Sequence, residues 1–192
     1  MRKWVIIVAS VYAVGCGDSA PLAPVNDGSP SVANFILLTE YDGYLADVQS
    51  TIPNVNIMIG EFSAIVADFN SGFVPLYWVG EYTKNLIKRV VEMQARGQQI
   101  RPQHPELLKL HLEEYEAALE DFRTGFSIFV QAIEQPGSVA TEGINDSIVA
   151  GNVHLIRLQI LLGDLGGRPV DFFAQGGGGG GGNENLDDEF GF

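Results

Sequence analysis

Apolar side chains recur every three or four positions through most of this chain. The first series is Leu38, Tyr41, Leu45, Val48, Ile52, Val55, Ile59, Phe62, Val66 and Phe69. This alternation of steps predicts one apolar stripe along an α-helix, because a helix repeats every 3.6 residues. Pro53 falls inside the stripe without shifting its phase, so we expect a kink there and not a break.

Three further series follow the same spacing. The second series is Val79, Thr83, Leu86, Val90, Met93, Gly97 and Ile100. The third series is Leu108, Leu112, Tyr115, Leu119, Phe122, Phe126, Phe129 and Ile133. The fourth series is Ile144, Ile148, Gly151, Leu155, Leu158, Leu162 and Leu165. No segment shows the two-residue alternation of a half-buried strand.

Proline and glycine mark the ends of these series. We expect the second helix to begin after Pro75 and to end near Arg101-Pro102, the third to run between Pro105-Glu106 and Pro136-Gly137, and the fourth between Ser138 and Gly166-Gly167. Four amphipathic helices joined by short turns predict an all-α fold, an antiparallel up-down four-helix bundle over residues 31–170.

The start of the first helix has no partner in this arrangement. Antiparallel pairing places Leu45 opposite Ile100, which leaves residues 31–44 beyond the end of the second helix. The segment contains Phe35-Ile36-Leu37-Leu38, which is too apolar to remain in water. We favour a fold-back at Gly43 over the open end of the bundle; the alternative is packing against another subunit.

The first 16 residues carry an export signal. Arg2 and Lys3 precede the apolar run from Trp4 to Val14, which is far shorter than the roughly 20 residues of a membrane span. Ala13-Val14-Gly15-Cys16 resembles the lipobox of bacterial lipoproteins. The resemblance implies a signal peptide over residues 1–15, diacylglycerol on the Cys16 sulfur and usually acylation of the new amino terminus. The alternative is an ordinary signal peptide with a cysteine near its cleavage site.

The residues after Cys16 bear on location. Gly17, and not aspartate, follows the cysteine. By resemblance to the sorting rules of enteric bacteria, this implies the outer membrane of the cell envelope, and it leaves open whether the protein faces the periplasm or the cell surface. Proline, glycine and small polar residues dominate residues 16–30, which predicts a lipidated flexible tether.

The C-terminal residues 171–192 form the second segment that we expect to be disordered. Seven consecutive glycines at 176–182 predict a flexible spacer. The acidic peptide that follows supplies the candidate partner-binding residues Leu186, Asp187, Asp188, Glu189, Phe190 and Phe192. It is similar to the acidic, phenylalanine-terminated tip of bacterial single-stranded-DNA-binding proteins. The likeness implies docking into a basic, apolar pocket of a protein partner or of this chain's own second helix. The alternative is an inert solubilising tail.

The charge balance excludes one class of partner. The 192 residues include 24 acidic and 11 basic side chains, for a net charge of −13. Such a surface repels phosphate backbones, so we expect no nucleic-acid binding. Five basic residues are concentrated near the second helix, namely Lys84, Lys88, Arg89, Arg96 and Arg101. We favour their pairing with the acidic first helix; the alternative is recruitment of an anionic partner.

The residues that carry chemistry form no recognisable constellation. We expect His104 to start a helix, and His111 and His154 to flank the core about 12 Å apart, too far for one metal ion to bridge. The acids crowded on the third helix, which are Glu113, Glu114, Glu116, Glu120 and Asp121, are expected mostly to face water. No Gly-x-Ser-x-Gly or Gly-x-x-x-x-Gly-Lys motif occurs. We therefore expect no enzyme activity, no metal and no cofactor.

These patterns lead to one functional hypothesis and one alternative. The hypothesis is a lipid-anchored, cell-envelope helical bundle that acts as a non-catalytic interaction or scaffold module, with its oligomeric state left open. The alternative is a carrier for an apolar small molecule, in which Thr83, Gly97 and Gly151 leave room inside the bundle.

Overall fold

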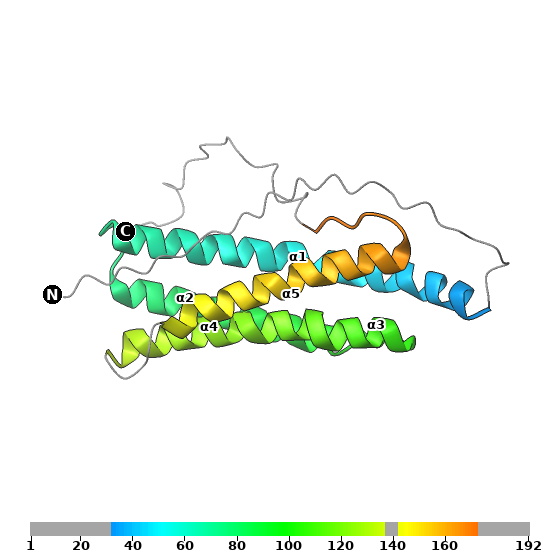
Figure 1. Cartoon of the computed structure of the whole chain (residues 1–192). Helices are drawn as coiled ribbons and strands as arrows, with labels where there is room; N and C mark the ends of the chain where they lie inside the picture. The colour runs from blue at the N-terminus through cyan, green and yellow to red at the C-terminus, as the bar shows by residue number, and fades with distance from the viewer. Residues whose placement is uncertain (1–31, 137–141, 173–192) are drawn as a thin grey trace, which may run out of the picture.

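The computed structural model of the chain describes residues 32–136 and 142–172. Within these ranges there is no strand, and the described part of the chain is all-α. The helices are α1 (Val32–Asn70), α2 (Leu76–Gly97), α3 (Pro105–Leu110), the π-helix η1 (His111–Glu116), α4 (Ala117–Glu134) and α5 (Glu142–Gly166). The segments α3, η1 and α4 follow one another without interruption and form one long helix (Figure 1).

Most helix boundaries agree with the proline and glycine signals, but α2 ends at Gly97, four residues before the expected Arg101-Pro102. Helix α2 begins directly after Pro75, and α3 begins at Pro105 with His104 as its N-cap. The Nδ1 atom of His104 accepts a hydrogen bond from the backbone N–H of Glu106 at 3.3 Å, so the expectation that His104 starts a helix is confirmed. Ser138 lies outside the described residues.

Helix α1 is continuous, and the expected fold-back at Gly43 is wrong. Gly43 lies inside α1, and the helix also passes through Pro53 without a break. Tyr41 and Tyr44 are buried, and the hydroxyl of Tyr41 donates a hydrogen bond to the carbonyl of Leu162 at 2.8 Å. The end of α5 therefore covers Tyr41, whereas Leu38, one turn earlier in α1, remains 48% exposed.

The turn between α1 and α2 depends on one glycine. Gly72 adopts a φ of 80°, a left-handed conformation that costs other residues energy. Its N–H bonds to the carbonyl of Phe69, and the N–H of Phe73 bonds to the carbonyl of Asp68, both at 3.0 Å. These two bonds define a Schellman motif, which ends α1 and leads the chain into Pro75.

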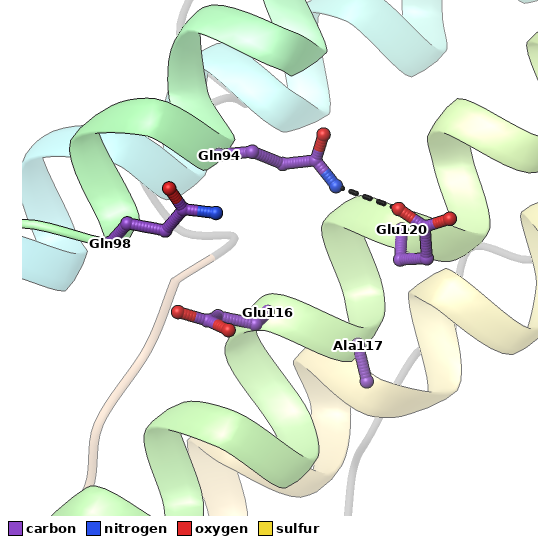
Figure 2. A pocket seen from close by; sticks show the side chains of 5 residues that line it. All are labelled: Gln94, Gln98, Glu116, Ala117 and Glu120. Carbon is purple, nitrogen blue, oxygen red and sulfur yellow. Dashed lines mark hydrogen bonds between the residues drawn. The ribbon is translucent and has the colours of Figure 1, made fainter.

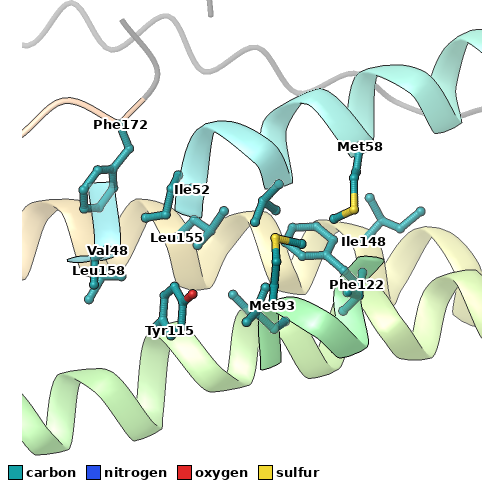
Figure 3. Packing of buried hydrophobic residues seen from close by; sticks show 14 of the residues in the cluster. Val48, Ile52, Met58, Met93, Tyr115, Phe122, Ile148, Leu155, Leu158 and Phe172 are labelled. Atoms are coloured by element: carbon teal, nitrogen blue, oxygen red, sulfur yellow. The ribbon is translucent and has the colours of Figure 1, made fainter. Parts of the chain in front are cut away.

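The apolar stripes supply the buried core. Figure 3 shows side chains from α1, α2, α4 and α5 packed together, among them Ile52, Met93, Phe122 and Leu155. Helix α4 contacts both α2 and α5, and α1 contacts α2. At Gly151 of α5 an added Cβ would lie 2.8 Å from the ring of Phe122, so these two helices approach each other closely at this point.

The stripe of the third helix is wrong at its start. The sequence spacing predicts that Leu108 and Leu112 face the core, but Leu112 is 46% exposed and Leu107 and His111 are buried in their place. The π-helix η1 is the physical reason, because each of its turns contains more than four residues. Leu107, His111, Tyr115 and Leu119, which are four positions apart, therefore share the buried face.

The segment after α5 packs back onto the helices. Gly167, with a φ of 61°, ends α5. Val170 and Phe172 are then buried, and the N–H of Phe172 donates to Oε1 of Gln159 at 2.9 Å. The carbonyl of Phe172 accepts from Nδ2 of Asn56 on α1 at 3.4 Å. The packed part of the chain therefore extends at least to residue 172, two residues beyond the expected boundary.

Helix α5 is also the one described helix that is long and apolar enough to cross a membrane, with a mean hydropathy of 1.3 over a window in Gly143–Gly166. Length and composition are weak evidence, because core helices pass the same test. Leu155, Leu158 and Leu162 are fully buried against the other helices. Only 28% of that window is buried, and Ile160 is 55% exposed, so one side of α5 packs in the core and another faces outward.

Candidate functional site

The site residues that the sequence predicts lie outside the described residues. Cys16 belongs to the segment before residue 32, and the acidic peptide with Leu186, Phe190 and Phe192 belongs to the segment after residue 172. The described residues contain two other features of functional interest, an exposed aromatic cluster and a buried polar cluster.

The exposed cluster lies at the α1–α2 turn and the first turns of α2. We call it the aromatic tip, and it consists of Phe73, Leu76, Tyr77, Trp78 and Tyr82. Phe73 is 81% exposed, Tyr77 67% and Trp78 62%. The rings of Tyr77 and Trp78 meet edge to face with centroids 5.9 Å apart. Three large rings in water at one place are unusual for a soluble surface and mark a candidate docking site.

The position of Phe73 makes this exposure informative. Phe73 follows the left-handed Gly72 of a Schellman motif, where an apolar residue frequently packs back onto the helix that it ends. Here the phenyl ring lies in solvent instead. The sequence does carry a signal for this tip. Phe73-Val74-Pro75-Leu76-Tyr77-Trp78 is an unbroken apolar run, and it lies between the first and second apolar series without belonging to either.

Basic side chains continue from the aromatic tip along α2. Lys84 lies 2.8 Å from both Glu81 and Glu134, and Arg89 pairs with Glu61 of α1. The Arg89 pair is the kind of contact expected between an acidic first helix and a basic second one. Lys88 and Arg96 are exposed and form no ion pair with any part of the chain that the structure describes. Part of the positive charge of α2 is therefore available to an anionic group.

The buried polar cluster centres on His111, whose side chain is 1% exposed. Its Nε2 atom lies 3.0 Å from the carbonyl of Gly97, and its Nδ1 atom lies 3.3 Å from the hydroxyl of Tyr44. A carbonyl can only accept, so Nε2 carries the proton and Nδ1 accepts from Tyr44. The imidazole also stacks on the ring of Tyr115 with centroids 5.1 Å apart. The expectation that His111 merely flanks the core is wrong, because the π-helix rotates it inward.

Burial sets the protonation of this cluster. Loss of solvation lowers the pKa of His111, and the nearby carboxylate of Glu116, 3.4 Å away, opposes the shift only in part. Burial also raises the pKa of Tyr44 and of Tyr115. The hydroxyl of Tyr115 makes no hydrogen bond with the described residues. Burial therefore favours the uncharged forms of His111, Tyr44 and Tyr115.

A second histidine connects two helices at the surface. Nδ1 of His154 on α5 lies 2.7 Å from Oε2 of Glu114, and its Nε2 lies 3.7 Å from Oδ2 of Asp121. The side chain of Glu114 is only 12% exposed, so this acid turns toward α5 and not toward water. Burial raises the pKa of Asp121. The contact joins η1 and α4 to α5 by polar groups.

One shallow hollow opens between α2 and the η1–α4 helix. It has a volume of about 340 Å³, and Gln94, Gln98, Glu116, Ala117 and Glu120 line it (Figure 2). The amide of Gln94 donates to Glu120 across it at 2.9 Å. Since four of its five lining side chains are polar, it does not suit an apolar guest.

The positions at which the sequence left room for such a guest are occupied. The ring of Tyr115 lies 2.8 Å from where a Cβ on Gly97 would be, and Phe122 fills the space beside Gly151. Thr83 is fully buried, and its hydroxyl donates to the carbonyl of Val79 at 2.8 Å. The two glycines let these rings approach their helices, and the rings leave no space for a ligand beside Gly97 and Gly151.

Among the described residues, no group of three or more histidine, cysteine, aspartate or glutamate side chains is placed to hold a metal ion. No protein-family model matches this chain, and no curated protein or solved structure is significantly similar to it. The surface geometry therefore carries the functional argument.

Proposed function

We propose that this protein is a lipid-anchored interaction module of the bacterial cell envelope, held in the outer membrane by acyl chains on Cys16. Its body is an antiparallel up-down four-helix bundle that acts without catalysis. The bundle presents the aromatic tip of α2 to a protein partner, and the acidic C-terminal peptide with Phe190 and Phe192 is a second contact element.

The helix contacts support the bundle. Helix α4 packs against α2 and α5, and α1 packs against α2. In Figure 1 the start of α2 and the end of α4 lie at one end, whereas the start of α1 and the end of α5 lie at the other. This alternation is what short connections between antiparallel neighbours produce.

The exposed aromatic tip is the observation that carries the functional proposal. The tip follows the C-terminal end of α1, whereas the expected lipid anchor precedes the N-terminal end of the same helix. The 39 residues of α1 place these two ends about 58 Å apart at the helical rise. A tether attached at Val32 therefore leaves the tip free to point away from the anchoring membrane. Aromatic side chains with polar edges are the ones enriched at protein interfaces.

Site-specific photo-crosslinking in cells tests the docking role. A photoreactive amino acid at Tyr77 is expected to give a discrete crosslinked protein product. The matched control places the same group at Ile57, an apolar side chain of α1 that is 53% exposed and lies outside the tip. Equal products from both positions, or none from Tyr77, would contradict the proposal.

Membrane fractionation tests the anchor separately. Cys16→Ser is expected to move the protein from the membrane fraction to the soluble fraction without lowering its Tm, because the tether separates the anchor from the folded part. Ala20→Ser, which changes the same segment but keeps the thiol, serves as the control and should stay in the membrane. Mass spectrometry that finds an unmodified Cys16 in the membrane-bound protein would refute the anchor.

A further inference from the structure

The charge of the described helices is uneven, and α2 stands apart from the rest. It holds four basic side chains, Lys84, Lys88, Arg89 and Arg96, against the two acidic ones Glu81 and Glu92. The other long helices, α1, α4 and α5, each have more acidic than basic residues. An acidic peptide near this protein is therefore repelled by most of its surface and attracted to α2.

The chain itself carries such a peptide. Residues 183–192 contain four acidic side chains, no basic one, and three apolar anchors, Leu186, Phe190 and Phe192. We propose that this C-terminal peptide binds α2 of its own chain, with its phenylalanines against the aromatic tip and its carboxylates beside Lys88 and Arg96. The inference rests on the proposed docking role of the tip and names the ligand that covers it.

The spacing of the two partners matches. Trp78 and Lys88 are ten residues apart on α2, which is about 15 Å along the helix. Asp187 and Phe192 are five residues apart, about 17 Å when the peptide is extended. A peptide that places Phe192 at the aromatic tip therefore brings Asp187 level with Lys88 along the helix axis. Trp78 and Arg96 lie on one side of α2, and Tyr77 and Lys88 lie on the adjacent side, about 80° away at the helical repeat. Each of these two cations therefore shares a face with a ring of the tip.

The chain between the two elements is long enough. Phe172 is held beside Asn56 of α1, and Asn56 lies 14 residues, about 21 Å, from the end of that helix. Crossing to the neighbouring helix adds about 10 Å. Residues 173–185 span at most about 45 Å. A spacer of this length and glycine content also has a root-mean-square span of about 20 Å, so it does not have to be fully stretched.

Because the peptide is attached to the same chain by its glycine-rich spacer, a weak contact is sufficient. A short flexible linker gives its attached peptide an effective concentration on the order of 1 mM. A peptide with an intrinsic Kd near 1 mM would then cover the tip about half of the time. The consequence is a docking face that this chain masks until a tighter partner displaces the peptide.

Trp78 reports directly on this contact. The sequence has two tryptophans, so the full chain with Trp4→Phe contains Trp78 alone. We expect deletion of residues 183–192, and the double change Phe190→Ala with Phe192→Ala, to shift the emission of Trp78 to longer wavelength and to raise its acrylamide quenching about twofold. Asn183→Ala with Asn185→Ala, which keeps the anchors and the charges, is the matched control and should change neither.

Two further measurements identify the occupant. A synthetic peptide of residues 183–192 added at millimolar concentration should restore the blue-shifted emission of the deletion variant, and Lys88→Glu should weaken this effect. If deletion leaves emission and quenching unchanged, the proposal is wrong. If the emission depends on protein concentration between 1 and 50 μM, the tip binds a second copy and the intrachain contact is likewise refuted. A crosslink from Tyr77 to a partner would survive either result, so the proposed function and this inference fail separately.

Discussion

The aromatic tip and the His111 cluster differ in what their side chains contact. At the tip, Phe73 and Trp78 lie mostly in water, although their rings are apolar. In the His111 cluster, an imidazole and two phenols are buried, although they carry polar atoms. Burial of Tyr44 and His111 is compensated by their hydrogen bonds, whereas Tyr77 and Trp78 of the tip contact each other and remain mostly exposed. This difference is the one expected if the cluster serves stability and the tip, as proposed, serves binding.

The largest expected effect compares two phenylalanines. Phe126 is fully buried, with its ring 4.9 Å from that of Phe62. Phe126→Ala should lower the free energy of unfolding by about 3 to 5 kcal/mol, because it leaves a cavity of the size of a ring. Phe73→Ala should change it by less than about 0.5 kcal/mol. Urea unfolding measures both, and similar losses would contradict the assignment of the tip to binding.

Two glycines provide the next comparison. An added Cβ at Gly151 would meet the ring of Phe122 and the carbonyl of Ala118 at 3.1 Å, whereas at Gly60 it meets nothing within 4 Å. We expect Gly151→Ala to cost about 1 to 3 kcal/mol by overpacking. Gly60→Ala should instead gain up to about 1 kcal/mol through helix propensity. Thermal unfolding measures the pair, and a higher Tm for Gly151→Ala would show that α4 and α5 do not pack this closely.

The smallest effect concerns pH. Because burial lowers the pKa of His111, the unfolded chain takes up a proton at this residue at a higher pH than the folded chain does. Stability should therefore fall as the pH drops through 6.5 toward the folded pKa, with at most about 1.4 kcal/mol per pH unit from this one proton. The groups around the ring are Tyr44, Tyr115, the Gly97 carbonyl, Glu116 and, farther away, Arg101.

His111→Gln isolates this contribution. Between pH 7.5 and 5 the Tm of the variant should fall less than that of the unchanged chain. His104→Asn, which removes a histidine but keeps a capping side chain at the start of α3, should follow the unchanged chain. An equal pH slope in His111→Gln and the unchanged chain would mean that His111 is not held neutral by burial.

The tail and the tip show how far sequence reasoning reaches toward the site. The sequence identified Phe190 and Phe192 as candidate anchors and the basic residues of α2 as a candidate partner surface. It did not identify Phe73, Tyr77 and Trp78, because apolar residues next to a turn are ordinarily buried by the neighbouring element. Whether they are covered depends on distant segments, and among the described residues nothing covers them.

Local periodicity determined the helical stripes of this protein, and proline and glycine determined most of their ends, because both signals act within a few neighbouring residues. Tertiary packing decided three points that periodicity leaves ambiguous. The π-helix selected His111 over Leu112 for the core, the rings of Tyr115 and Phe122 filled the space beside Gly97 and Gly151, and α5 covered Tyr41 of an α1 that continues through Gly43. Each depends on side chains brought together from residues far apart in the chain, and a stripe on one helix carries no information about what will face it.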